Sequence, residues 1–362
     1  MPPGCRIVWL CLAVAVVFGA CGGPSTAGDF PRLTGPYVGQ PPPGDKPVLF
    51  APGLISTGMP VRDVAITPDG KEFFFGVNLG RESVTTILCT RETDAGWTPP
   101  EVAPFAADPT VDTIEPAISP DGRWFFFVSN RPALALSSAE NNYDIWVMER
   151  DGDHWGEPVH VGPPVSTAAQ EFFPSVTRDG TLYFCRAAAD GRHYFFRSRR
   201  EDGRYVTAER LGPRVNAAPT QFNAFIDPDE RFFILCAFGL EHSRGATDYY
   251  VCFRDEHDRW TRPINLGPHI NTASGNEFSP YVSPDGKYFF FMSTRTNQAG
   301  FLTEGRLTYA GIQRMFQQPG NGNSDIYWVR AGFIEALRPG AAAFAVDDPP
   351  PESGKEGRDA QE

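Results

Sequence analysis

Acidic and amide side chains occupy two recurring positions upstream of five similar turns. The turn aspartates are Asp69, Asp121, Asp179, Asp229 and Asp285. Eight residues before them stand Glu171, Gln221 and Glu277, and six residues before them stand Asp63, Glu115 and Asn223. Side chains of a strand alternate between its two faces, so residues two apart lie on the same side. If these segments are inner strands around one channel, we expect Asp63, Glu115, Glu171 and Glu277 to form an acidic ring at its mouth.

Clustered carboxylates of this kind support three interpretations. In the first interpretation they bind a hard cation such as Ca²⁺ through oxygen ligands, although the sequence does not single out residues as metal ligands. A pair of them hydrolyses a glycan by acid–base catalysis, for which the candidates are Glu115, Glu171 and Glu277. Without catalysis, the two positions bind a ligand at the channel mouth, and this interpretation includes Gln221 and Asn223 with the four acids.

Charged residues also recur at the strands that follow the turns. Arg131 and Arg295 end second strands, and Asp144, Asp248 and Asp325 begin third strands. Both arginines are candidates for ligand binding because these strand ends lie at the same face as the acidic ring. Recurrence at equivalent places also predicts hydrogen bonds inside each repeat, and we favour that structural role for these five residues.

The turns that position these residues are hairpin turns. A typical copy is Ser-Pro-Asp-Gly at residues 283–286, followed by the aromatic run at 288–292. Proline and glycine at these places of a tight turn, flanked by aromatic and β-branched residues, predict two antiparallel strands. The turn aspartates are therefore expected to form the hairpins rather than a site.

Repetition of this hairpin predicts an all-β fold, a single five-bladed β-propeller. A strand-only repeat of about 50 residues is typical of one four-stranded propeller blade. The blades are expected at residues 59–105, 106–163, 164–213, 214–268 and 269–338, and a six-bladed ring is the alternative. A strand at residues 47–56 precedes every inner strand, so it is expected to pair with the strand at 325–329 and close the ring.

The last repeat carries a long insert, and the chain ends in a polar tail. Residues 296–324 separate two strands of this repeat and include a possible helical turn at 307–317. Long loops in compact domains are often functional, so Phe301, Tyr309 and Phe316 are candidates for docking a partner. The tail at 339–362 is small and charged and is expected to be disordered.

The N-terminus predicts export and a lipid anchor. Residues 1–20 contain one arginine and an apolar run of 14 residues, at 7–20, which is too short to span a bilayer and is typical of a signal peptide. The sequence Gly-Ala-Cys-Gly at 19–22 resembles the bacterial lipoprotein box, which makes Cys21 the lipidation site. Residues 21–46 are rich in glycine and proline and are expected to form a linker.

Composition limits the possible partners. The formal net charge of −12 argues against binding nucleic acid, whose phosphates need a basic surface. No Cys-x-x-Cys motif is present, so a zinc site is not expected. Cys236 and Cys252 either pair across one hairpin or remain buried thiols. The single repeat domain is expected to be a monomer.

The repeat resembles a known family. The sequence Ser-Pro-Asp-Gly-Lys, a Phe-rich strand, Ser-Thr-Arg and then Asp-Ile-Tyr-Trp-Val is similar to the WD40-like propeller repeat of TolB-type periplasmic proteins, over about residues 47–338. Members of this family generally act by binding partners. The resemblance therefore implies a lipoprotein of the bacterial periplasm or outer membrane that binds an envelope protein or a glycan, with a sialidase- or arabinanase-like hydrolase as the alternative and no cofactor apart from a possible Ca²⁺.

Overall fold

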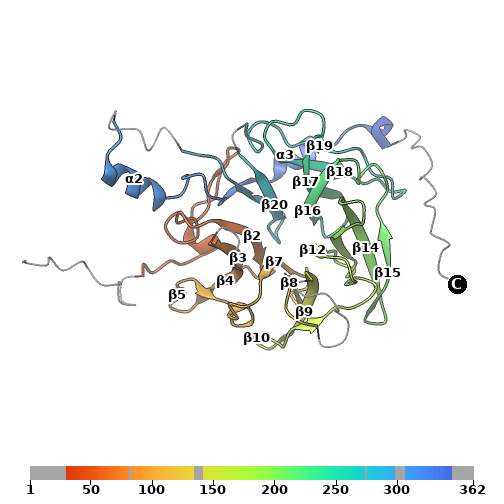
Figure 1. Cartoon of the computed structure of the whole chain (residues 1–362), viewed down its shortest axis with the longest axis horizontal. Helices are drawn as coiled ribbons and strands as arrows, with labels where there is room; N and C mark the ends of the chain where they lie inside the picture. The colour runs from red at the N-terminus through yellow and green to blue at the C-terminus, as the bar shows by residue number, and fades with distance from the viewer. Residues whose placement is uncertain (1–29, 81–83, 134–141, 274, 298–305, 345–362) are drawn as a thin grey trace, which may run out of the picture. The chain divides into compact units, whose positions relative to one another are not determined.

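The computed structural model describes residues 30–80, 84–133, 142–273, 275–297 and 306–344. Contacts divide the chain into a unit that ends at Arg32 and a unit that begins at Leu33, and the second unit holds all the strands. Five antiparallel sheets form the blades of a β-propeller, as the repeat predicted. Figure 1 shows the inner strands gathered around the middle of the ring and the outer strands at its periphery.

The first three blades follow the chain in order. The first blade contains β2 (Val61–Ile66), β3 (Glu72–Leu79), β4 (Val84–Thr93), β5 (Gly96–Trp97) and β6 (Glu101–Val102). The second blade contains β7 (Thr113–Ile118), β8 (Trp124–Ser129), β9 (Asp144–Asp151), β10 (His154–Trp155) and β11 (Val159–His160). The third blade contains β12 (Glu171–Val176), β13 (Leu182–Ala187), β14 (His193–Glu201) and β15 (Arg204–Arg210).

The last two blades complete the ring. The fourth blade contains β16 (Thr220–Ile226), β17 (Phe232–Phe238), β18 (Asp248–Phe253) and β19 (Ile264–Asn265). The fifth blade contains β20 (Glu277–Val282), β21 (Tyr288–Ser293), β22 (Asp325–Arg330) and β1 (Val48–Leu49). Short helices connect or flank the sheets: η1 (Tyr37–Gly39), η2 (Pro104–Ala106), α2 (Tyr309–Phe316), α3 (Gly332–Ala336) and η3 (Ala341–Phe344).

The N-terminal strand closes the ring, which confirms the predicted pairing. In β1, Val48 lies opposite Trp328 of β22 and Leu49 lies opposite Tyr327. Phe50, which is fully buried, then donates its backbone N–H to the Ile326 carbonyl at 2.8 Å. The outer edge of the last sheet is therefore covered by the start of the propeller, which leaves no unpaired edge there.

Each hairpin turn is held by its aspartate. In four blades a Ser or Thr hydroxyl donates to the turn carboxylate, as between Ser283 and Asp285 at 2.7 Å. The same oxygen accepts the backbone N–H two residues on, here that of Lys287 at 3.1 Å. The fourth blade differs, because Glu230 has a φ of 55° where the other turns carry glycine. Four of the five turn aspartates thus have the structural role that the sequence predicted. In the fourth turn Asp227 accepts the backbone N–H groups of Asp229 and Arg231, and the Asp229 carboxylate accepts from Arg178 instead.

Aromatic side chains pack between neighbouring blades. Phe74 of the first blade meets Phe125 of the second edge to face, with ring centroids 4.8 Å apart. Phe195 and Phe233 make the corresponding contact between the third and fourth blades at 5.0 Å. Large aromatic side chains bury much apolar surface, so these contacts stabilise the ring and fix the blade spacing.

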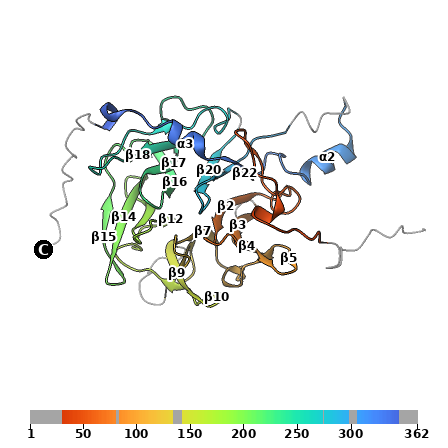
Figure 2. The same cartoon turned by 180° about the vertical axis from the view of Figure 1, so that it is seen from behind.

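The structure extends order beyond the predicted limits of the propeller. The expected linker ends earlier than residue 46, because Tyr37 packs on Tyr288 and Trp328 and Val38 is buried. The part of the expected disordered tail at 339–344 is ordered, since η3 is formed and Phe344 is buried, and residues 345–362 lie outside the described residues. In both segments a few apolar residues within a polar stretch pack against the propeller. Figure 2 shows α3 from behind, where Ile334 joins the core of the last two blades.

The four cysteines in the described residues are buried and free. Cys236 lies opposite Tyr249 and Cys252 lies opposite Phe233, so the two thiols are out of register by three residues. They also belong to different core clusters. The hairpin therefore keeps them apart. Within the described part of the chain, no helix has the length and apolar character needed to cross a membrane.

Candidate functional site

The inner strand of every blade contains a bulge at the same position. The bulged residues have left-handed backbone angles and are Asp63 (φ 52°), Glu115 (φ 58°), Phe173 (φ 50°), Asn223 (φ 44°) and Ser279 (φ 66°). The strand register shifts at each of these places. Such angles are uncommon for residues other than glycine, and bulges often re-aim side chains next to functional sites.

The bulged residues form a polar ring that joins the blades across the channel. The Ser279 hydroxyl donates to Asp63 Oδ1 at 2.5 Å, and the Glu115 N–H donates to Asp63 Oδ2 at 3.2 Å. The Phe173 N–H donates to Glu115 Oε2 at 2.7 Å. Asn223 completes the set with a long contact of 3.5 Å from its Nδ2 to the Ser279 hydroxyl. All five blades thus contribute to this set of contacts, which we call the polar ring.

Arg62 supplies the positive charge beside the two acids of the polar ring. Its Nε donates to Asp63 Oδ2 at 3.0 Å and its Nη2 donates to Glu115 Oε1 at 3.1 Å. Its guanidinium also lies over the ring of Phe278, 5.2 Å from the centroid. One arginine therefore bridges two buried carboxylates at the place where a bound cation would have to lie.

Burial dominates the electrostatics of Glu115. The residue is only 4% exposed, and loss of solvent raises the pKa of its carboxyl to about 7. Arg62 opposes this shift in pKa, while the charge of Asp63 adds to it. Glu115 therefore changes its protonation state close to neutral pH, unlike an ordinary glutamate.

A pocket of about 540 Å³ opens above the polar ring, on the face where the inner strands begin. We call it the channel-mouth pocket. The residue just before each bulge contributes to its lining, which gives Arg62, Ile114, Phe172, Phe222 and Phe278. The end of β3 adds Asn78, and the starts of the third strands, with the residues just before them, add Thr85, Tyr143, His193 and Thr247. The loops entering the inner strands add Asp112, Gln170 and Asn276. None of the described lining residues belongs to the insert at 306–324, so this part of the insert does not fill the pocket.

The structure places only part of the predicted acidic ring at the channel. Asp63, Glu115 and Asn223 belong to the polar ring, and Glu115 and Asn223 also line the channel-mouth pocket. Glu171 and Glu277 lie elsewhere, so the expected ring of four carboxylates is not formed. The physical reason is the bulge, since a left-handed residue breaks the alternation by which positions two apart share one side of a strand.

Glu171, Glu277 and Gln221 instead fix the loop that enters each blade. Glu171 has no exposed surface, and it accepts hydrogen bonds from the Thr167 hydroxyl at 2.7 Å and from Arg186 Nε at 2.7 Å. Glu277 is equally buried and accepts from the hydroxyls of Thr272 at 2.8 Å and Ser293 at 3.0 Å. Gln221 accepts the Ala218 N–H through its Oε1 and donates its Nε2 to Asn216 Oδ1. Burial raises the pKa of Glu171 to about 6 and raises that of Glu277 as well.

Arg131 and Arg295 also bond within the scaffold. Arg131 Nη2 donates to the Phe105 carbonyl at 2.8 Å and to the Thr113 hydroxyl at 3.2 Å. Arg295 Nη2 donates to the Ile270 carbonyl at 2.5 Å and lies 3.8 Å from Glu277 Oε1. The aspartates that begin third strands are buried too, and Asp325 accepts the Gly320 N–H at 2.7 Å. These contacts match the structural role that their recurrence indicated.

The apolar wall of the channel-mouth pocket was not predicted from the sequence. It consists of Phe172, Phe222 and Phe278, which are half-buried and stand one residue before the bulge. The sequence signal for this wall is a phenylalanine that recurs directly before the bulged position in three of the five inner strands. Its meaning depends on the bulge, because an ordinary strand would turn these phenylalanines away from the acids.

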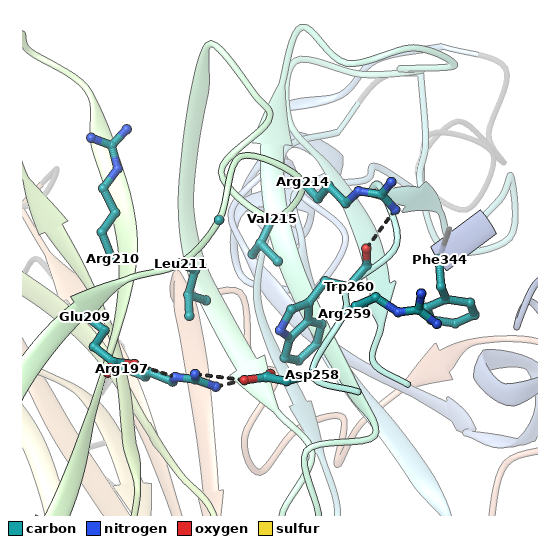
Figure 3. Close-up of a pocket in the computed structure, with 11 residues that line it drawn as sticks. Arg197, Glu209, Arg210, Leu211, Arg214, Val215, Asp258, Arg259, Trp260 and Phe344 are labelled. Carbon is teal, nitrogen blue, oxygen red and sulfur yellow. Dashed lines mark hydrogen bonds and ion pairs between the residues drawn. The ribbon is translucent and has the colours of Figure 1, made fainter. Parts of the chain in front are cut away.

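Two further cavities are less suited to a ligand. The far end of the channel holds about 170 Å³ lined mainly by prolines and apolar residues of the turns. A cleft of about 290 Å³ lies at the outer seam between the third and fourth blades and carries four arginines (Figure 3). Arg197 in this cleft is held by Glu209 at 3.1 Å and Asp258 at 3.0 Å, and Arg214 bonds the Trp260 carbonyl at 3.1 Å.

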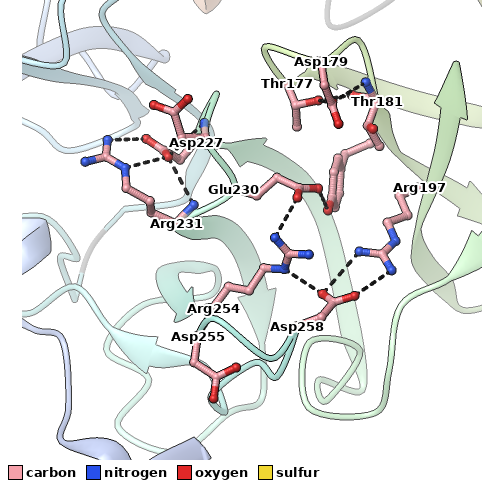
Figure 4. A network of polar contacts seen from close by, with 12 residues as sticks. Thr177, Asp179, Thr181, Arg197, Asp227, Glu230, Arg231, Arg254, Asp255 and Asp258 are labelled. Atoms are coloured by element: carbon pink, nitrogen blue, oxygen red, sulfur yellow. Dashed lines mark hydrogen bonds and ion pairs between the residues drawn. The ribbon is translucent and has the colours of Figure 1, made fainter.

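The charges along this seam belong to a network that joins the two blades (Figure 4). Arg254 donates to Glu230 at 2.7 Å and to Asp258 at 2.6 Å, and Tyr183 donates to Glu230 at 2.5 Å. Partners from both blades therefore neutralise one another. Within the described residues, no group of three or more His, Cys, Asp or Glu side chains is arranged to hold a metal ion.

No protein-family model and no curated protein matches the sequence. Solved structures of similar fold include a protein assigned as TolB from Agrobacterium tumefaciens, with 14% identity and a TM-score of 0.42 over 65% of this chain and 70% of that one. TolB from Acinetobacter baumannii has 14% identity and a TM-score of 0.42 over 75% of this chain, and the match spans 57% of that protein. A protein of unknown function from Dyadobacter fermentans has 12% identity and a TM-score of 0.40, over 69% of this chain and 79% of that chain.

The described chain is a five-bladed β-propeller, and TolB-like propellers are among its structural neighbours, as the repeat predicted. At these identities the similarity is one of fold alone.

Proposed function

We propose that this chain is a lipid-anchored binding protein of the bacterial cell envelope, and that its propeller holds a glycan in the channel-mouth pocket. The observation that carries the proposal is the pocket itself. Described residues of all five blades line its volume of about 540 Å³, which lies in the size range of ligand sites. The sequence left an envelope protein and a glycan as partner classes, and the lining favours the glycan.

The lining combines apolar faces with neutral polar groups. Phe172, Phe222 and Phe278 offer ring faces on which the C–H surface of a sugar ring can pack. The side-chain amides of Gln170 and Asn276 have no hydrogen-bond partner among the described residues, so they remain able to bond sugar hydroxyls. A ligand with both apolar ring faces and many hydroxyls matches this combination.

The charged groups of the channel-mouth pocket disfavour an anionic ligand. Arg62 is already paired with Glu115, and Asp112 accepts the Tyr143 hydroxyl at 2.5 Å and the Thr85 N–H at 2.7 Å. Burial lowers the pKa of His193, so this side chain is neutral at pH 7. A strongly anionic glycan would find no uncompensated cation of the kind that phosphate or carboxylate groups require.

The anchor rests on the sequence at residues 7–22, outside the described residues. An apolar run of signal-peptide length leads to Cys21, which places the propeller at a membrane of the cell envelope. Incorporation of a radiolabelled fatty acid into the wild-type chain, and its loss in Cys21→Ser, would support this part of the proposal. Equal labelling of both proteins would refute it.

The hydrolase alternative finds less support in the geometry. Of its three candidates, Glu171 and Glu277 have no exposed surface and are not among the described residues that line the channel-mouth pocket. Glu115 lies beside Asp63, but Arg62 holds both carboxylates. A catalytic pair requires two carboxyl groups that flank an accessible bond, and this arrangement does not offer them.

A glycan array followed by calorimetry tests the proposed ligand. We expect the full chain to bind a small set of neutral oligosaccharides, and we expect Gln170→Ala and Asn276→Ala each to weaken binding about tenfold, through the loss of one hydrogen bond to the ligand. Phe238→Ala is the matched control, since Phe238 is 51% exposed and lies outside the pocket. If no glycan binds and affinity capture instead recovers one envelope protein that depends on Gln170 and Asn276, the partner is a protein and the glycan assignment is wrong.

A further inference from the structure

Helix α2 in the insert of the last blade presents an apolar face to solvent. Leu307 is 69% exposed, Tyr309 77%, Ile312 36% and Phe316 65%. The last three residues follow a helical spacing of three and four, so they lie on one side of the helix. The helix buries none of its own residues. An exposed face of this kind on a soluble domain marks an interaction surface.

The helix is held in a fixed place. The Thr308 hydroxyl accepts the Gly311 N–H at 3.0 Å, which caps the first turn. Asn321 Nδ2 donates both to the Phe316 carbonyl at 3.1 Å and to the Gly58 carbonyl at 3.0 Å. Asn323 Nδ2 adds a second bond to Gly58 at 2.8 Å. The last turn of α2 is therefore fastened to the loop between β1 and β2, and the apolar face does not need to fold on binding.

The charge of this segment points to an anionic partner. The insert at 296–324 contains Arg306 and Arg314 against one acidic residue, Glu304, so it is slightly basic although the whole chain has a formal net charge of −12. Basic residues beside an aromatic and aliphatic face are typical of helices that lie in the surface of an anionic membrane.

The expected linker at 21–46 joins the propeller at the edge from which α2 projects, so a lipid on Cys21 would limit the distance between this edge and a membrane. Trp97 donates its backbone N–H to the Leu33 carbonyl at 2.8 Å and its indole N–H to the Gly35 carbonyl at 2.8 Å. Tyr37 then packs on Tyr288 of the last blade. If Cys21 carries the lipid, the 12 residues from there to Leu33 reach at most about 40 Å. With that anchor, the edge formed by the first and last blades, where α2 projects, cannot lie farther than this from the bilayer.

We propose that α2 is a membrane-surface helix, whose residues Tyr309, Ile312 and Phe316 insert into the interface of an anionic lipid bilayer. The placement at the membrane rests on the proposed lipid anchor, whereas the affinity of the helix for lipid does not. Docking onto the bilayer would orient the propeller and add a second attachment to the acyl anchor.

Vesicle flotation tests the proposal without the acyl chains. The full chain carrying Cys21→Ser is mixed with vesicles of phosphatidylethanolamine and phosphatidylglycerol, or of phosphatidylethanolamine and phosphatidylcholine. We expect flotation with the anionic vesicles, and at least about a tenfold lower bound fraction when Ile312→Ser and Phe316→Ser are added. Phe238→Ser removes a phenylalanine of the fourth blade that is 51% exposed, against 65% for Phe316, and should leave flotation unchanged. Equal flotation of all variants, or equal loss in the Phe238→Ser control, overturns the proposal.

A photo-crosslinking amino acid at position 312 in intact cells separates lipid from protein occupants. Recovery of crosslinked phospholipid supports the membrane role, while recovery of one specific envelope protein overturns it in favour of a protein partner. Glycan binding should be unchanged in the α2 variants, because none of the described lining of the channel-mouth pocket comes from this helix. Failure of the membrane proposal therefore leaves the pocket proposal intact, and the reverse also holds.

Discussion

Replacing Glu115 by glutamine tests whether the polar ring buries an acid that titrates near neutral pH. The pKa of this carboxyl rises from 4.5 to about 7 on folding, chiefly through loss of solvent. Because the folded-state pKa lies above the unfolded-state pKa, the unfolded chain binds fewer protons between these values. The free energy of unfolding therefore falls as the pH rises through this window. For one group with these two pKa values, the loss between pH 5 and pH 8 is about 2–3 kcal/mol.

Urea denaturation of the full chain at several pH values measures this loss. In the wild type, other buried acids add to the slope in the same direction, because burial raises the pKa of Glu171 and Asp325 to about 6. We expect Glu115→Gln to reduce the loss of stability between pH 5 and pH 8 by about 2–3 kcal/mol relative to the wild type. Glu256→Gln is the matched control, since the Glu256 side chain is 88% exposed, and its pH profile should follow that of the wild type. A Glu115→Gln profile parallel to the wild type would refute the burial of a titrating acid in the ring.

Two further predictions concern the polar ring and the closure of the propeller. Ser279→Ala leaves Asp63 without its hydroxyl donor and should lower the free energy of unfolding by about 1–3 kcal/mol. The exposed control Ser243→Ala should change it little. Equal effects of the two substitutions would argue against the polar ring. Phe50→Ala removes a fully buried side chain that packs on Phe290 and Trp328, and it should lower the free energy of unfolding in urea by about 3–5 kcal/mol. The same change at the half-exposed Phe238 should lower it by less than about 1 kcal/mol. A small effect at Phe50 would mean that the N-terminal segment does not hold the last blade.

Much of the fold could be predicted because it depends on local signals that repeat. Four of the five turns combine Asp with a Ser or Thr hydroxyl two residues earlier, and both act within five residues of sequence. The closing strand was predictable by elimination, since residues 47–56 precede every inner strand and had to pair with the last sheet. The helical turn in the insert was also expected, and α2 spans Tyr309–Phe316.

The candidate site was predictable only in part. Asp63, Glu115 and Asn223 were found from their recurrence, but Glu171 and Glu277 were assigned to the same surface by an alternation that the bulge interrupts. A left-handed Phe173 or Ser279 has no signature in its residue type, because the ring of neighbouring blades imposes the angle rather than the local sequence. The apolar wall at Phe172, Phe222 and Phe278 depends on the same bulge and was missed for that reason.

Hydrogen–deuterium exchange with and without a bound oligosaccharide tests the central claim most directly. If the ligand lies in the channel-mouth pocket, exchange should slow in peptides that contain the starts of β2, β7, β12, β16 and β20 and the loops that line the pocket. Peptides of the turn face and of the outer seam between the third and fourth blades should exchange at unchanged rates. Protection confined to the seam or to the turn face would contradict the account, because the ligand would then lie outside the channel mouth.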